Sequence, residues 1–154
     1  MHISAFVPAT SVEMEANKVN ATGIPLYGRR LPPLEADQVH RVAAPILFSA
    51  WTENGRDPNP CLYIQVRDPN GERRGGAELI WLWNDVPDHP AKWIVWSLKV
   101  PYLVFEAGVY TFSVFNRPDD PQEEALAQYP FAIFFDPAAP FPESEVPPGS
   151  TYQK

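Results

Sequence analysis

Cysteine is nearly absent from this chain, which has only Cys61 among its 154 residues. One thiol excludes an intramolecular disulfide and a multi-cysteine metal site, and it suits a reducing compartment. A chain of this length does not need such links, because it can bury about two-thirds of its unfolded surface. We expect Cys61 to be a small buried side chain at the start of a strand.

Long apolar runs and basic clusters are also missing. No apolar run reaches about 18 residues, the length of a membrane-spanning helix, and the apolar N-terminal stretch lacks a preceding basic region. The net charge is −7, and residues 117–154 carry seven acidic against two basic residues. The pairs Arg29-Arg30 and Arg73-Arg74 are too short for a nucleic-acid or anionic-membrane surface. We expect a cytoplasmic protein with neither of these partners.

Sequence motifs of the common catalytic classes do not occur. The chain lacks a G-x-S-x-G elbow, a glycine-rich phosphate loop and an H-E-x-x-H pair. His2, His40 and His89 are far apart in sequence, so they lack the short spacing of common zinc sites. We therefore expect no enzymatic activity, no metal and no cofactor.

Proline is abundant, and its distribution predicts an all-β fold. Nineteen prolines and eight glycines leave room for strands but rarely for a helix longer than two turns. The segments 34–42 and 121–128 are the two candidates for a short helical turn. The expected strands cover residues 2–7, 11–22, 42–52, 62–67, 77–83, 92–100, 109–116 and 131–135.

Two of these segments alternate apolar and other residues with the period of a half-buried strand. Asp68-Pro-Asn-Gly71 follows the first of them and is typical of a chain reversal. We expect six side chains to point into one core: Leu62, Ile64, Val66, Tyr110, Phe112 and Val114. Eight short strands at this spacing predict an antiparallel two-layer β-sandwich spanning residues 1–136.

The layout resembles small bacterial proteins that have an immunoglobulin-like β-sandwich and no established activity. The similar features are the segment Lys18-Val-Asn-Ala-Thr-Gly23, the Asp68–Gly71 turn and the strand Gly108-Val-Tyr-Thr-Phe-Ser-Val114. The resemblance implies an immunoglobulin-like fold and supplies no functional residues. Residues 137–154 differ from the rest, because they combine prolines with acidic and small residues and no apolar alternation, so we expect an extended tail.

Tryptophan supplies the main candidate site. Trp81 and Trp83 alternate with Ile80 and Leu82 on one expected strand, and Trp93 lies opposite the core face of the next. Both faces of both strands are thus apolar, which requires a cover on the second face. Residues 21–41 or another protein chain can supply that cover. Trp81, Trp83 and Trp93 are the candidate anchors of an interface with a protein partner or a second copy.

The loop 84–90 carries the alternative site. Asp85, Asp88 and His89 lie between the tryptophan-bearing strands, and polar groups beside indole rings suit a small ligand or a sugar. Asp and Asn before proline also form ordinary turns. The sequence thus predicts a non-catalytic interaction or structural module, with a small-ligand or carbohydrate-binding domain as the alternative.

Overall fold

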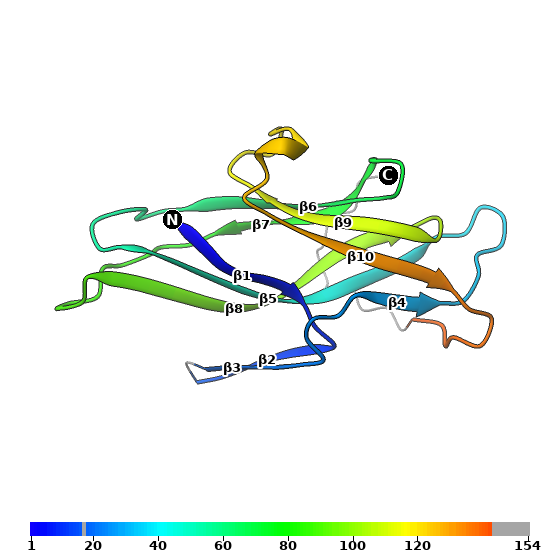
Figure 1. Ribbon diagram of the computed structural model, residues 1–154, viewed down its shortest axis with the longest axis horizontal. Helices are drawn as coiled ribbons and strands as arrows, with labels where there is room; N and C mark the ends of the chain where they lie inside the picture. Colours follow the sequence, from blue (N-terminus) through cyan, green and yellow to red (C-terminus); the bar gives the residue numbers. More distant parts are fainter. Residues whose placement is uncertain (17, 143–154) are drawn as a thin grey trace.

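The computed structural model describes residues 1–16 and 18–142, which form short and long strands joined by turns (Figure 1). In chain order, the elements are β1 (His2–Pro8), β2 (Ser11–Glu15), β3 (Lys18–Thr22), β4 (Gly28–Leu31), β5 (His40–Glu53), β6 (Cys61–Arg67), β7 (Arg73–Ile80), β8 (Ala91–Val104), β9 (Gly108–Phe115), the 3-10 turn η1 (Gln122–Glu124) and β10 (Ala127–Phe135).

Eight of these strands form a single sheet in the order β1-β5-β8-β7-β6-β9-β10-β4. The sheet curls strongly into a half-barrel, and the pair β10–β4 is parallel whereas the others are antiparallel. The expected two-layer, antiparallel, immunoglobulin-like sandwich is therefore wrong. The prediction of a mainly β-strand protein is confirmed.

A close approach at glycine explains why one sheet forms instead of two layers. Strands β7 and β8 pair only through Gly75 and Tyr102. A Cβ atom at Gly75 would collide with the carbonyl oxygen of Pro101 and with the Cα of Tyr102. The absence of a side chain lets the two backbones meet. This single pair joins β1, β5 and β8 to the remaining strands of the sheet.

The segment 21–41, which we named as a candidate cover, contributes a strand to the sheet. Strand β4 pairs in parallel with β10, and Gly28 again allows a close approach, here to the backbone of Ala132. No helix forms at 34–42, where the segment contains a single turn, with the N–H of Gln38 donating to the carbonyl oxygen of Glu35 at 3.2 Å, and β5 begins at His40. Its ring Nε2 lies 2.7 Å from the carbonyl oxygen of Pro32. The second expected turn is present as η1.

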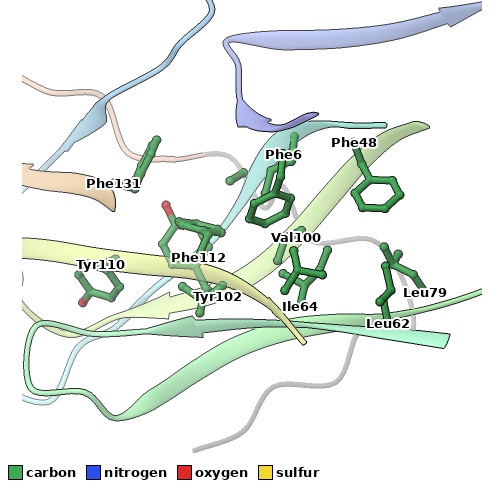
Figure 2. Packing of buried hydrophobic residues seen from close by; sticks show 14 of the residues in the cluster. Phe6, Phe48, Leu62, Ile64, Leu79, Val100, Tyr102, Tyr110, Phe112 and Phe131 are labelled. Atoms are coloured by element: carbon green, nitrogen blue, oxygen red, sulfur yellow. The ribbon is translucent and has the colours of Figure 1, made fainter. Parts of the chain in front are cut away.

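The core fills the concave side of the curled sheet (Figure 2). All six side chains selected from the alternation are buried. The Phe112 ring packs edge-to-face on Tyr102 and Phe131, with centroids 5.2 and 5.6 Å apart. Aromatic contacts of this kind add to the hydrophobic stabilisation, so the inward-facing alternation is confirmed.

A hairpin made of β2 and β3 covers part of the convex side. Its alternation separates an apolar face, with Val12 and Val19, from an exposed polar face. Ser97 Oγ on β8 donates a hydrogen bond to the carbonyl oxygen of Val12 at 2.6 Å. Residues 11–22 therefore supply part of the cover over the second apolar face of these strands.

The described chain ends shortly after β10. A turn follows Asp136, which accepts hydrogen bonds from the backbone N–H groups of Ala138 and Ala139 at 2.9 Å each. Phe141 is 76% exposed. Most of the expected tail, residues 143–154, lies outside the described residues, so the boundary at 136 stays a prediction.

Candidate functional site

The three candidate tryptophans separate into two environments. Trp81 and Trp83 lie in the core, with 8% and 6% of their surface exposed, whereas Trp93 is 58% exposed. Burial of this degree leaves the first two unable to contact a partner in the folded chain. Trp93 is the one of the three that can anchor an interface.

Backbone hydrogen bonds beyond the end of β7 determine which side chains of residues 80–83 face the core. The N–H of Trp81 donates to the carbonyl of Pro60 at 3.4 Å, and the N–H of Trp83 donates to Pro58 at 2.8 Å. The β6–β7 ladder thus continues through residue 83. Because strand side chains alternate, Ile80 and Leu82 point to the convex side.

The buried indoles belong to an aromatic cluster at one end of the half-barrel. The Trp81 ring lies 4.8 Å from Trp96, 5.5 Å from Trp83 and 6.4 Å from Phe48 between centroids. Nε1 of Trp81 and Nε1 of Trp83 are buried, and neither has a hydrogen-bond partner among the described residues. Ring packing therefore holds these indoles in place, and the ammonium of Lys92 lies 5.6 Å from the centroid of the Trp83 ring.

Four large apolar side chains remain exposed on the convex side of β7 and β8, and we call them the outer apolar surface. They are Ile80 at 66%, Leu82 at 79%, Trp93 at 58% and Val95 at 36% exposed. The sequence pattern placed Ile80, Leu82 and Trp93 on the second face, but of the three predicted anchors only Trp93 lies there, because Trp81 and Trp83 are buried. The period-2 pattern shows that two faces are apolar, and only the tertiary contacts show which face is covered.

Polar groups on β6 and β7 border this surface. Cys61 pairs with Ile80, and Tyr63 pairs with Glu78. Cys61 is half-buried and its Sγ donates to Glu78 Oε1 at 3.5 Å, so it is less buried than expected. Hydrogen bonding with Cys61, and then with Glu78, raises the pKa of Tyr63 to about 12. Tyr63 is therefore neutral at pH 7.

The alternative site in the loop 84–90 is built around Asp85 and a lysine that sequence analysis missed. Lys92 is 1% exposed, and its ammonium donates to the carbonyl oxygen of Trp83 at 2.6 Å and to Asp85 Oδ1 at 3.0 Å. The backbone N–H of Gly55 also donates to Asp85 Oδ1, at 2.9 Å. This bond, followed by that from Lys92, lowers the pKa of Asp85. The Asp85 carboxylate is therefore already hydrogen-bonded to groups of the chain itself.

Asn54 holds the same loop from a neighbouring turn. Its Nδ2 donates to the carbonyl oxygens of Val86 and His89, both at 2.7 Å. The N–H of Val86 donates back to Asn54 Oδ1 at 3.3 Å. The pairing of Glu53 with Ala91 brings the two turns together. No local pattern signals this contact, because it depends on the β5–β8 register.

The hollow at this end is small. It has a volume of about 240 Å³ and is lined by residues that include Trp83, Asp85 and Lys92, whereas Asp88 and His89 do not line it. Asp88 lies at a positive φ of 62°, and the N–H of His89 donates to the carbonyl of Val86 at 3.2 Å. These features are typical of a turn. The structure thus brings one of the three candidate polar residues to the hollow.

Within residues 1–16 and 18–142, no group of three His, Cys, Asp or Glu side chains is arranged to hold a metal ion. The same part of the chain contains no helix long and apolar enough to span a membrane. Comparison with known proteins gives no matching family, no similar curated protein and no similar solved structure.

Proposed function

We propose that this chain is a non-catalytic interaction module that binds a second copy of itself through the outer apolar surface. The exposure of Leu82, Ile80 and Trp93 on the convex side of β7 and β8 carries this proposal. Large apolar groups gathered on one face usually mark a contact with another molecule, because exposure to water is unfavourable. The hairpin β2–β3 leaves these side chains exposed.

A second copy is the occupant that suits this surface best. An interface with twofold symmetry needs only a surface that is complementary to itself, and an apolar surface meets that condition. Interfaces between identical subunits are also more apolar than other contacts. Trp93 is the expected centre, since tryptophan is enriched among the residues that dominate binding energy.

The geometry of the loop 84–90 favours this function over ligand binding. Small-molecule sites usually enclose about 300–1,000 Å³. The hollow beside Asp85 is smaller, at about 240 Å³. Its carboxylate and the ammonium of Lys92 already bind each other and the backbone. The concave pocket with inward-facing free groups that a ligand site requires is therefore not supported.

Light scattering across a range of protein concentrations tests the proposal. We expect the mass of the wild-type chain to rise toward that of a dimer with concentration. Leu82→Ser and Trp93→Ser should each weaken association by at least about 30-fold, which corresponds to about 2 kcal/mol. Val109→Ser is the matched control, because Val109 is 55% exposed on β9, away from this surface, and its loss should leave association unchanged.

A wild-type chain that stays monomeric at every concentration overturns the proposal. Equal association of the wild type, Leu82→Ser and Trp93→Ser shows instead that the copies meet through another surface. Far-ultraviolet circular dichroism on each variant establishes that the sheet is intact. Both substitutions alter exposed side chains, so we expect unchanged spectra.

A further inference from the structure

Two arginines lie side by side at the end of the sheet where β6 turns into β7 (Figure 1). Arg67 of β6 is directly opposite Arg73 of β7, and on its other side it is opposite Thr111 of β9. Directly opposite residues of paired strands share one face, with Cβ atoms about 5 Å apart. Val66 and Phe112, which precede and follow these positions in the chain, point into the core. The three side chains therefore form a row on the convex side, which we call the arginine row.

The arginine row has no carboxylate to neutralise it. Arg67 and Arg73 form no ion pair within residues 1–16 and 18–142. Asp68 follows Arg67 in the chain but lies on the core side, where it accepts from Arg74 Nε at 2.6 Å. Like charges on directly opposite residues repel each other. Other basic side chains do pair with carboxylates, among them Arg30, Arg56, Arg74 and Lys92.

Neutral groups hold Arg67 in position. Its Nη1 donates to the carbonyl oxygen of Gly71 at 2.8 Å, and its Nη2 donates to Gln65 Oε1 at 3.1 Å. Gln65 is 1% exposed, and its Nε2 donates to the carbonyl oxygen of Pro118 at 2.7 Å. This chain of hydrogen bonds orients the guanidinium of Arg67 and supplies no negative charge, so the charge stays available to a ligand.

Both arginines also have donors without acceptors. Nε of Arg67 and Nε of Arg73 are buried, and neither has a hydrogen-bond partner among the described residues. A buried N–H group without an acceptor is unfavourable, so each side chain gains when it turns toward one. Arg67, Arg73 and Thr111 are each partly exposed, which lets an acceptor from solution reach the arginine row.

We propose that the arginine row binds the phosphate dianion, either free or as the monoester group of a small molecule. Two guanidinium groups match its two negative charges, and their forked N–H groups match the arrangement of its oxygens. The hydroxyl of Thr111 donates to a further oxygen. Water can accept the same hydrogen bonds but leaves two like charges uncompensated, and a carboxylate compensates only one of them.

Nuclear magnetic resonance titration of the ¹⁵N-labelled full chain at pH 7 tests the site. The side-chain Nε–H signals of Arg67 and Arg73 report directly on the unpaired donors, and we expect both to shift saturably with inorganic phosphate. Glycerol 3-phosphate should shift the same signals. Tighter binding of this monoester assigns the site to a small phosphorylated molecule, and equal or weaker binding assigns it to free phosphate. Acetate carries one charge and should bind at least about tenfold more weakly.

Three results of this titration would overturn the proposal. Absence of saturable Nε–H shifts with both phosphates excludes the site. Saturation by acetate at the same concentration as phosphate excludes the ligand class. Saturable shifts confined to Arg29 and Arg30, with Arg67 and Arg73 unchanged, place the anion elsewhere on the chain.

Substitution of one arginine tests the paired charges. Arg73→Gln should weaken phosphate binding at least about tenfold, because a charge-assisted contact is lost. Arg73→Lys keeps the charge without the forked geometry and should weaken binding less. Arg56→Gln is the matched control, because Arg56 is exposed in the turn after β5 and pairs with Glu53 at 3.1 Å. Equal phosphate binding by the wild type and Arg73→Gln overturns the assignment.

Thermal unfolding gives an independent measurement. Without phosphate, Arg73→Gln should melt at or above the temperature of the wild type, because a repulsive cross-strand pair is removed. Phosphate should raise the melting temperature of the wild type and of Arg56→Gln, and leave that of Arg73→Gln nearly unchanged. An equal rise in all three contradicts binding at the arginine row. Self-association through the outer apolar surface is read separately by light scattering.

Discussion

At the scale of single residues, Asp68 is the most densely bonded carboxylate described in the chain. The expected reversal at Asp68–Gly71 is confirmed, with the N–H of Gly71 donating to the Asp68 carbonyl at 2.9 Å. Asp68 Oδ1 accepts from the N–H groups of Asn70 and Glu72 at 2.9 Å each. Its Oδ2 accepts from Arg74 Nε at 2.6 Å. The side chain is fully buried, so these bonds replace its water.

The bonds around Asp68 make stability depend on pH. Burial acts to raise the pKa of this carboxyl, but the hydrogen bond from Arg74 and those from the backbone outweigh it and lower the pKa. In the unfolded chain, the pKa of the Asp68 carboxyl is about 3.9. Because the pKa of Asp68 is lower in the folded chain, its ionised carboxylate stabilises the fold at pH values above the unfolded pKa. This stabilisation is lost as the pH falls through the pKa of the folded chain.

Asp68→Asn should therefore lower the free energy of unfolding at pH 7 by about 1–3 kcal/mol, because a charge-assisted bond to Arg74 is lost. The difference from the wild type should shrink as pH falls from 5 toward 2. Urea unfolding at several pH values measures it. Asp119→Asn, at an exposed loop residue, is the control and should change stability little. A difference that stays constant down to pH 2 contradicts this account.

At the scale of elements, strand β7 decides the shape of the molecule. Along its length β7 pairs with β6, but it meets β8 only at Gly75. Beyond that pair the two strands diverge, and the inward side chains of Trp81 and Trp96 pack between them. The outward side chains Ile80 and Leu82 remain on the convex side. The same divergence thus produces both the aromatic cluster and the outer apolar surface.

Gly75→Ala should lower the free energy of unfolding by about 1–3 kcal/mol, as overpacking in a tight site does. The added Cβ meets backbone atoms of Pro101 and Tyr102, which cannot rotate away. Chemical denaturation measures the change. Glu78→Ala, at an exposed position of the same strand, controls for altered strand propensity and should have a small effect. Equal stability of Gly75→Ala and the wild type would show that β7 and β8 do not need this contact.

At the scale of the whole molecule, one continuous core spans the half-barrel. Phe48, Trp81 and Trp83 of the aromatic cluster belong to the same buried cluster as Tyr110 and Phe131. Because β5 and β8 pair over fourteen residues, they connect the two ends of the half-barrel. We infer that neither end has a core of its own on which to fold independently.

Unfolding should therefore be a single cooperative transition. Tryptophan fluorescence reports on the five tryptophans, which are Trp81, Trp83 and Trp96 of the cluster and the paired Trp51 and Trp93. Far-ultraviolet circular dichroism reports on the whole sheet. We expect the two probes to give the same denaturant midpoint, because both depend on one core. Midpoints that differ beyond their errors would show that the tryptophan end unfolds separately.

The sequence by itself indicated most of the strands and which of their side chains face inward, but it missed β4 and took the hairpin β2–β3 for one strand over 11–22. Alternation identified the inward side chains of β6 and β9, including Leu62 and Phe112, and the turn chemistry of Asp68–Gly71 identified their reversal. It also separated Ile80 and Leu82 from the face of Trp81. These features are local, since they depend on the two-residue period of a strand and on the backbone preferences of proline and glycine.

Only the tertiary structure decided which strands are neighbours and which apolar face stays exposed. The single sheet depends on one close approach at Gly75, and the parallel β4 depends on its pairing with β10. Such long-range pairings have no periodic signal, because they arise from contacts that form only when the whole sheet curls around its core.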